Sequence, residues 1–182
     1  METVLSRRLV ELFEWIDPGP GSTHLVSDIS GWWRDPDVLA QVGPALAGLF
    51  PDDHPTVVIA PEVTGLLLGP LVAVAAGAGF LPAYKDGGER RRAGPTRWAQ
   101  TPPDYRGRRL RVGVDGRRLN PGDRVLLVDD WVDTGAQLDA LCRVVRDAGA
   151  ALIGAAALVA TCPPAVAERL TLRALVTGDQ LP

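Results

Sequence analysis

The stretch RVLLVDDWVDTG, residues 124–135, decides the fold of this chain. Four apolar residues run without a break into Asp129 and Asp130, as in a strand that is covered on both faces and ends at the edge of a parallel sheet. A threonine and a glycine then stand directly before a segment with helical spacing, residues 136–148. A buried strand, a short polar loop and a helix in this order predict one repeat of an α/β fold.

The same alternation extends to both sides of this stretch. Apolar, β-rich runs predict further strands at residues 56–60, 80–84, 108–114 and 150–160, and helical spacing predicts a helix at residues 66–78. Strands that alternate with helices predict a central, mostly parallel sheet flanked by helices. In such a Rossmann-like α/β fold, ligands bind beyond the carboxyl ends of the strands.

Other patterns govern the rest of the chain. Residues 5–16 have the spacing of an amphipathic helix, and residues 24–29 predict a short extended segment. Asp35 is expected to cap a helix that begins at Pro36. Residues 86–107 contain Gly-Pro and Pro-Pro pairs among many arginines, which predicts a long surface loop.

Length and composition narrow the class of protein. The chain has 182 residues and a net charge of −3, so a single domain, residues 1–182, is expected and a nucleic-acid partner is not. Residues 63–84 carry no charge, but glycines and prolines interrupt them, so no membrane span is expected. Cys142 and Cys162 lack metal-site or disulfide spacing, and the amino terminus lacks the order of a secretion signal. We therefore expect a cytoplasmic protein.

The polar residues of the deciding stretch predict a ligand site. The adjacent carboxylates of Asp129 and Asp130 are fixed acceptors, which suit the hydroxyls of a ribose or the oxygen shell of magnesium. Thr134 and Gly135 precede the start of a helix, where backbone amides can bind a phosphate. Together these features predict a site for a ribose 5-phosphate. Without a ligand, the same residues form a strand, a turn and a helix capped by Asp133 or Thr134.

This combination of an apolar strand, two acids, two apolar residues and a Thr-Gly loop resembles the signature of type I phosphoribosyltransferases, which bind phosphoribosyl pyrophosphate (PRPP). Over residues 17–160 the order of motifs is most similar to the adenine phosphoribosyltransferases. The resemblance implies the type I phosphoribosyltransferase fold, with a small hood at about residues 17–35 and a mobile loop. It also implies transfer of 5-phosphoribose from magnesium-bound PRPP to a purine base, adenine favoured, with release of pyrophosphate in purine salvage, by a homodimer.

The resemblance assigns roles to individual residues. Asp104 is expected to be catalytic because it matches the loop acid of the adenine family. Asp133 replaces a small residue of the adenine pattern, but Asp-Thr-Gly at this place is similar to the hypoxanthine-guanine phosphoribosyltransferases, whose acid lies near the purine, so Asp133 is also expected to be catalytic. Val26 and Ser27 are expected to contact the base. The residues expected to bind PRPP are Val63, Thr64, Lys85, Asp129, Asp130, Asp133, Thr134, Gly135, Ala136 and Gln137, of which Asp129 and Asp130 are expected to hold magnesium through PRPP and water. A structural reading stays open for both catalytic candidates, since Asp133 can cap a helix and Asp104 can be an exposed loop charge.

Several positions depart from the pattern of the adenine family. Ser27 stands where an arginine is usual in the hood. Val63 and Thr64 replace a Ser-Arg pair, and Tyr84 replaces the arginine before Lys85. These changes fall where the base or the pyrophosphate is recognised. Two alternatives therefore stay open: a non-catalytic PRPP-binding regulatory protein of the same fold, or a phosphoribosyltransferase for a different base.

Overall fold

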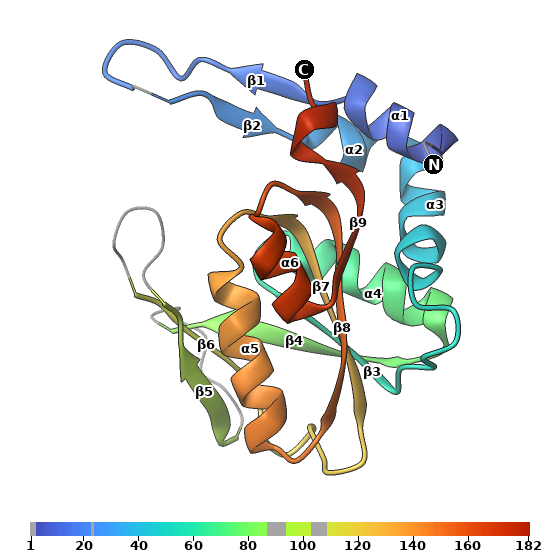
Figure 1. Cartoon of the computed structure of the whole chain (residues 1–182), viewed down its shortest axis with the longest axis vertical. Coiled ribbons are helices and arrows are strands. Elements are labelled where there is room, and N and C mark those ends of the chain that lie inside the picture. Colours follow the sequence, from blue (N-terminus) through green and yellow to red (C-terminus); the bar gives the residue numbers. More distant parts are fainter. Residues whose placement is uncertain (1–2, 23, 87–93, 103–108) are drawn as a thin grey trace.

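A seven-stranded sheet forms the centre of the computed structural model, which describes residues 3–22, 24–86, 94–102 and 109–182 (Figure 1). Its strands are β3 (Val57–Pro61), β4 (Gly79–Lys85), β5 (Thr96–Gln100), β6 (Arg111–Asp115), β7 (Arg124–Val132), β8 (Ala151–Ala160) and β9 (Leu172–Thr177). They are ordered β5-β6-β4-β3-β7-β8-β9. The pairings of β4 with β3, β3 with β7, β7 with β8 and β8 with β9 are parallel. Strand β6 pairs antiparallel with both β4 and β5. The mostly parallel sheet predicted from the sequence is confirmed.

Helices cover both faces of this sheet (Figure 1). They are α1 (Val4–Glu11), α2 (Ser30–Arg34), α3 (Pro36–Ala47), α4 (Gly65–Ala76), α5 (Ala136–Asp147) and α6 (Pro164–Leu170), followed by the short 3-10 helix η1 (Gly178–Gln180). Alternate residues of β7 belong to two hydrophobic clusters. Leu126 and Val128 pack in the cluster of α3 and α4, whereas Val125 and Leu127 pack in the cluster of α5. Strand β7 is therefore buried on both faces, as its continuous apolar run predicts.

Strand β7 is longer than its apolar run indicates. The sequence predicted a strand that ends at Val128, but β7 continues through both acids to Val132. The reason is its neighbour, because β8 keeps pairing to the end, with Trp131 opposite Val159 and Val132 opposite Ala160. The two acids therefore lie on a paired strand and not in a loop, and the sheet fixes their backbone positions.

The amino-terminal helix predicted at residues 5–16 is wrong in its second half. Helix α1 ends at Glu11, and β1 (Glu14–Ile16) then pairs antiparallel with β2 (Val26–Asp28). The chain turns after α1 so that Phe13 enters the core, whereas the apolar residues Trp15 and Ile16 of β1 are each 42% exposed. This hairpin stands apart from the main sheet (Figure 1) and begins earlier than the hood expected from about residue 17.

The long loop predicted at residues 86–107 is wrong in part, because it contains strand β5. This strand pairs antiparallel with β6, and Trp98 lies opposite Gly113. A β-carbon at Gly113 would lie 2.6 Å from a ring carbon of Trp98, so the glycine makes room for the tryptophan. Polar residues are tolerated on a strand at the edge of a sheet, which is why composition did not reveal it. No prediction covered α6, β9 or η1.

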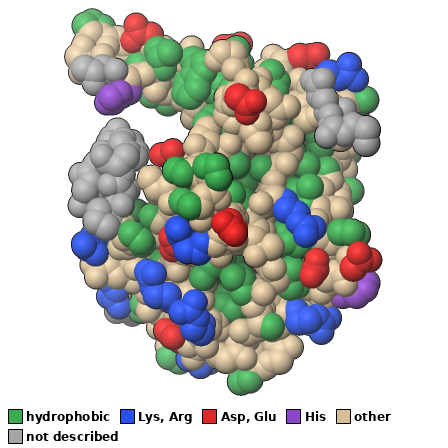
Figure 2. All heavy atoms as spheres, in the orientation of Figure 1, with side chains coloured by type: hydrophobic (Ala, Val, Ile, Leu, Met, Phe, Trp, Pro, Cys, Tyr) green, Lys and Arg blue, Asp and Glu red, His purple; other side chains and the backbone are tan. Residues whose placement is uncertain are grey.

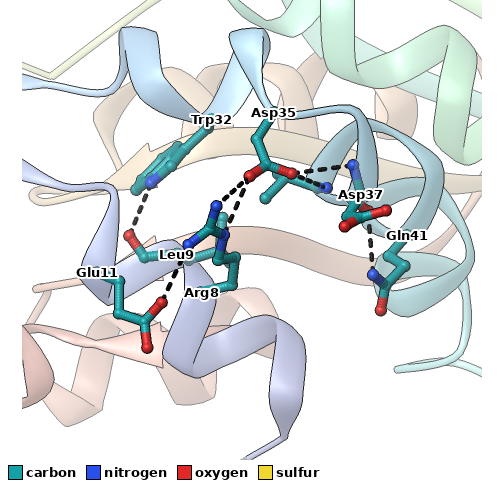
Figure 3. Close-up of polar contacts among 8 residues, drawn as sticks. Arg8, Leu9, Glu11, Trp32, Asp35, Asp37 and Gln41 are labelled. Atoms are coloured by element: carbon teal, nitrogen blue, oxygen red, sulfur yellow. Dashed lines mark hydrogen bonds and ion pairs between the residues drawn. The ribbon is translucent and has the colours of Figure 1, made fainter.

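A network around Asp35 fastens α1 to the start of α3 (Figure 3). One carboxylate oxygen of Asp35 accepts hydrogen bonds from Nε and Nη2 of Arg8 at 3.0 and 2.7 Å. The other oxygen accepts from the backbone amides of Asp37 and Val38, and so caps α3. The indole of Trp32 donates to a backbone oxygen of α1 at 2.8 Å. The cap predicted at Asp35 is confirmed.

Helix α4 occupies much of the uncharged stretch at residues 63–84. Its buried residues pack against α3 and β3, so the apolar composition of this stretch is used for packing on the sheet. Among the described residues, no helix combines the length and the apolar character that crossing a membrane requires.

Helix α6 packs against the loop between β7 and α5 at Gly135. This glycine is left-handed, with a φ of +71°, and a β-carbon on it would lie 2.7 Å from Val166 and 3.0 Å from Leu170. Gly149, just after α5, has a similar φ of +73°, but the nearest atom to its β-carbon position is one of Pro121 at 3.5 Å. A comparison of substitutions at these two glycines therefore separates the cost of a left-handed backbone from the cost of steric crowding.

We predict that Gly135→Ala lowers the free energy of unfolding by roughly 1 to 3 kcal/mol more than Gly149→Ala does. Both substitutions force an alanine into a left-handed conformation, but only the first drives a methyl group into α6. Urea unfolding of the two variants measures the difference. Equal losses would show that α6 shifts without cost, contrary to the close packing at Gly135.

Candidate functional site

A cavity of about 240 Å³ opens at the carboxyl ends of β4 and β7, beside the start of α5. The predicted site residues that line it are Lys85, Asp129, Asp133, Thr134, Gly135, Ala136 and Gln137. The structure thus brings together residues from two strands and one helix start. Asp130, Val63 and Thr64, which the sequence also assigned to PRPP binding, do not line this cavity.

The loop before α5 has the form of an anion site. Gly135 occupies the N-cap position in a left-handed conformation and has no side chain with which to cap the helix. The hydroxyl oxygen of Thr134 accepts a hydrogen bond from the Ala136 amide at 3.3 Å, which holds the loop against the first turn. The first amides of a helix lack intrahelical partners and lie at the positive end of its dipole. A phosphate group in the cavity would meet these amides directly.

Gln137 adds an unsatisfied polar group to the same cavity. Its Oε1 atom is buried and has no hydrogen-bond partner within the described part of the chain. A buried polar atom without a partner costs free energy, so such an atom in a cavity points to a ligand. Because the oxygen and nitrogen of a side-chain amide can exchange places by a flip, Gln137 can present either an acceptor or a donor to that ligand.

The two acids of β7 differ in burial. Asp129 is 5% exposed and lines the cavity, whereas Asp130 is half-buried. Loss of solvent raises the pKa of the Asp129 carboxyl well above its ordinary value, and the neighbouring charge of Asp130 raises it further. The positive charge of Lys85 acts in the opposite direction. Burial in the cavity therefore disfavours the ionised form of the Asp129 carboxyl group, which water would otherwise stabilise.

Glu62 ties the loop after β3 to the end of β4. A carboxylate oxygen of Glu62 accepts the Lys85 amide at 2.6 Å, and the Glu62 amide donates to the Ala83 oxygen at 2.8 Å. This loop therefore lies beside Lys85 at the same edge of the sheet. Val63 and Thr64 follow directly, with Val63 exposed and Thr64 at the start of α4. Neither residue is part of the cavity wall.

Thr101 and Leu110 close the base of the loop that connects β5 to β6. The Thr101 amide donates to the Leu110 oxygen at 2.7 Å, and the Leu110 amide donates to the Thr101 hydroxyl at 2.9 Å. Both residues line the cavity, so the loop starts and returns at its mouth. Asp104, the predicted catalytic acid of this loop, lies outside the described residues.

A second cavity, of about 610 Å³, lies between the hairpin and the end of β7. The predicted base contacts Val26 and Ser27 line it from the hairpin side, and Thr161 lines it from the end of β8. Trp131 and Asp133 line both cavities. A ligand with its phosphate at α5 could therefore extend past these two residues and place an attached ring beneath the hairpin, which projects above the body of the molecule in Figure 2.

Three aromatic rings join the hairpin to the end of β7. The ring centroids of Trp131 and Phe13 are 5.7 Å apart, and those of Trp131 and Trp15 are 6.1 Å apart. Phe13 and Trp15 meet edge to face at 4.9 Å. The sequence indicated Trp131 only as one of the two apolar residues between the acids and the Thr-Gly loop, and it indicated no role in the site for Trp15. The signal available was the position of Trp131 between the acids and the phosphate loop.

The side chains at this cavity can hold a metal ion only if a bound ligand supplies most of the coordinating atoms. Within the described residues there is no group of three or more histidine, cysteine or acidic side chains that could hold a metal ion. Magnesium takes six oxygen ligands and usually keeps several waters and substrate phosphates among them. Asp129 and Asp130 fit that pattern as a partial site, completed by an oxygen-rich ligand.

We predict that Asp129→Asn stabilises the protein at neutral and higher pH. The folded state holds the Asp129 proton more tightly than the unfolded chain, so stability falls as pH rises from about 4 through the raised pKa. Asparagine removes this loss and still accepts the Asp130 amide. Thermal unfolding at pH 7.5 should show an increase of roughly 2 to 4 °C, the shift that about 1 kcal/mol gives a domain of this size.

Asp52→Asn, at an exposed position, is the matched control and should leave the unfolding temperature nearly unchanged. A lower unfolding temperature for Asp129→Asn at pH 7.5 would contradict the view that burial strains this carboxyl group.

Solved structures share this architecture. The chain superposes on adenine phosphoribosyltransferase from Rhodothermus marinus with a TM-score of 0.80 at 24% identity, over 95% of this chain and 98% of that one. It superposes on the Trypanosoma brucei enzyme in complex with AMP, pyrophosphate and ribose-5-phosphate with a TM-score of 0.82 at 18% identity, over 99% of this chain and 82% of that one. The fold is that of type I phosphoribosyltransferases.

Sequence comparison leads to the same family. Residues 34–169 match the phosphoribosyl transferase domain family. The chain is 33% identical over 155 residues to adenine phosphoribosyltransferase from Myxococcus xanthus, which covers 82% of this chain and 77% of that protein. It is 32% identical over 156 residues to the Streptomyces coelicolor enzyme of the same name, with coverage of 86% and 81%. The chain therefore belongs to the phosphoribosyltransferase family.

Proposed function

We propose that the protein transfers 5-phosphoribose from magnesium-bound PRPP to a purine base, adenine first, and releases pyrophosphate in purine salvage. One observation carries this proposal. The cavity of about 240 Å³ at α5, here called the phosphate cavity, and the cavity of about 610 Å³ beneath the hairpin, here called the base cavity, share Trp131 and Asp133. A sugar phosphate and a base placed in these cavities would meet at the shared wall. The names of the relatives from Myxococcus xanthus and Streptomyces coelicolor support adenine as the base.

Each part of PRPP has a matching group in this arrangement. The amides of the loop at residues 134–137 would bind the 5-phosphate, and Asp129 would accept hydrogen bonds from the ribose hydroxyls inside the cavity. Asp130, which does not line the cavity, would act through water. Lys85, with the backbone near Val63 and Thr64, would face the diphosphate. The base would lie beneath the hairpin, against Val26 and Ser27.

The reaction exchanges one bond at the sugar for another. The bond from C1 of the ribose to the diphosphate oxygen breaks, a bond from C1 to the base nitrogen forms, and the base gives up a proton. Lys85 would stabilise the charge that develops on the leaving diphosphate. Asp133, at the wall shared by the two cavities, would accept the proton of the base, and Asp104, from the segment between Thr101 and Leu110, would be the second catalytic acid.

Magnesium would neutralise further charge on the diphosphate when bound. Asp129 and Asp130 would hold it through the hydroxyls of PRPP and through water, in keeping with the partial donor set described above.

A second candidate, a non-catalytic PRPP-binding regulator, has one observation in its favour. Of the described residues that line the phosphate cavity, Lys85 alone is a cation, although a diphosphate carries several negative charges. A site with few cations can bind PRPP yet stabilise the leaving group poorly. A phosphoribosyltransferase for another base is the remaining alternative, because Ser27 alters the base cavity.

We predict that the purified protein, with magnesium and PRPP, forms AMP from adenine and releases pyrophosphate. Chromatography of the products measures this turnover, and hypoxanthine, guanine and uracil are the comparison bases.

Lys85→Ala should weaken PRPP binding about tenfold or more and leave ribose 5-phosphate binding nearly unchanged, since only PRPP carries the diphosphate. Arg118→Ala, an exposed cation outside the cavity, is the control.

The outcomes separate the candidates. PRPP binding without pyrophosphate release from any base would replace the enzyme by the regulator. Turnover with a base other than adenine would retain the enzyme and change its substrate. Equal losses of PRPP and ribose 5-phosphate binding in Lys85→Ala would contradict the role given to this lysine.

We also propose a homodimer in the cytoplasm. Val63, Leu67 and Val74 are 77%, 57% and 83% exposed. Leu67 and Val74 are seven residues apart and lie on one side of α4, and Val63 directly precedes the N-cap of this helix. A row of exposed apolar side chains is typical of a surface covered by a partner, and a twofold dimer covers it with the same surface of a second copy. The cysteines Cys142 and Cys162 are free thiols, in keeping with a reducing compartment.

We predict that the wild-type protein sediments as a dimer at micromolar concentration and that Leu67→Glu shifts it to a monomer. Two charges brought together across a twofold interface repel each other and lose solvent. Val4→Glu, at an exposed apolar position on α1, should leave the sedimentation coefficient unchanged. A monomeric wild-type protein would contradict this assembly.

A further inference from the structure

Thr161 lies at the boundary of the base cavity and none of the roles above includes it. It follows directly after β8, and its amide donates to the Val132 oxygen at 2.9 Å, which fixes its backbone to the end of β7. The indole Nε1 of Trp131 donates to the Thr161 hydroxyl oxygen at 3.0 Å. An indole can only donate, so this bond occupies the oxygen and leaves the hydroxyl hydrogen to be donated elsewhere.

Two acceptors lie within reach of that hydrogen. One is a carboxylate oxygen of Asp133 at 3.4 Å, and the other is the backbone oxygen of Val132 at 3.4 Å. Both distances exceed the usual range for a hydroxyl donor. The carboxylate is the stronger acceptor because it is charged, and hydrogen bonds in a site often shorten when a ligand binds. Trp131, Thr161 and Asp133 therefore form a chain of groups along the wall of the base cavity.

The methyl group of Thr161 is held as firmly as its hydroxyl. A β-carbon on Gly178 would lie 2.9 Å from the Thr161 methyl carbon, so η1 leaves no space beside it. Threonine has few side-chain rotamers, and packing on the methyl side keeps the hydroxyl turned toward Trp131 and Asp133. Trp131 is itself fixed by β8 and by Phe13 and Trp15.

We infer that Thr161 is a positioning residue, which together with Trp131 aims the Asp133 carboxylate into the base cavity. There the carboxylate accepts a hydrogen bond from a ring N–H of the incoming base, while the flat face of the base lies near the Trp131 ring. This inference rests on the proposed function and deepens it. The site selects planar nitrogen heterocycles that present an N–H donor at the edge facing Asp133.

Binding experiments test this inference without requiring turnover. Calorimetry would measure adenine and ribose 5-phosphate separately on the wild-type protein, Thr161→Val and Thr161→Ser. Valine keeps the shape and removes the hydroxyl, so adenine affinity should fall at least about fivefold, with ribose 5-phosphate affinity within about twofold of wild type. Serine keeps the hydroxyl and should retain adenine affinity within about threefold.

Two further variants keep the test sharp if Thr161→Val folds poorly. Trp131→Phe keeps an aromatic ring but removes the indole N–H, and should reproduce most of the loss in adenine affinity. Combining Thr161→Val with Asp133→Asn should cost no more adenine affinity than Asp133→Asn alone, because the threonine acts through the carboxylate.

Wild-type adenine affinity in Thr161→Val, an equal loss in Thr161→Ser, or additive losses with Asp133→Asn would each overturn the inference. Failure of the wild-type protein to bind either adenine or ribose 5-phosphate would instead overturn the proposed function itself, and this inference with it. Binding of both ligands, unaffected by Thr161→Val, would overturn the inference alone.

Discussion

The pairing of β8 with β7 beyond the apolar run is the constraint on which the site depends. Because β7 stays paired with β8 through Val132, the sheet fixes the backbone of both acids and of Trp131. Asp129, Trp131, Val132 and Asp133 all line the phosphate cavity, whereas Asp130 does not. A strand that ended at Val128 would impose no such order on the acids, the tryptophan and the phosphate loop.

The same pairing forces Asp129 into the core, where its carboxyl group loses solvent. Burial without a full set of partners costs stability, and the raised pKa of Asp129 is the expression of that cost. Ribose hydroxyls and cations brought by a ligand would supply the missing partners. The site therefore gives up stability in the free protein for a set of acceptors that needs no rearrangement when the ligand binds.

The part of the site that is local in the chain could be predicted from the sequence. The acids, the Thr-Gly loop and the helix start lie within residues 124–148, and each carries its own signal. Thr161 and Trp15 could not be predicted, because they reach the site only through long-range pairing of β8 with β7 and of β1 with β2. The helix predicted to extend to Ile16 is wrong in its second half for the same reason, because the burial of Phe13 depends on residues far along the chain.

The departures from the family pattern in the base cavity are consistent with one another. Ser27 takes a positive charge away from the hairpin side, and Asp133 adds a negative charge on the sheet side. With the cation gone, the cavity has an acceptor at one edge and aromatic surface from Trp15 and Trp131 around it. Such a cavity disfavours rings that present only acceptors at that edge, because their lone pairs would face a carboxylate. The large side chain of Trp131 then serves two functions. Its ring packs against the hairpin, and its N–H holds the Thr161 hydroxyl beside Asp133.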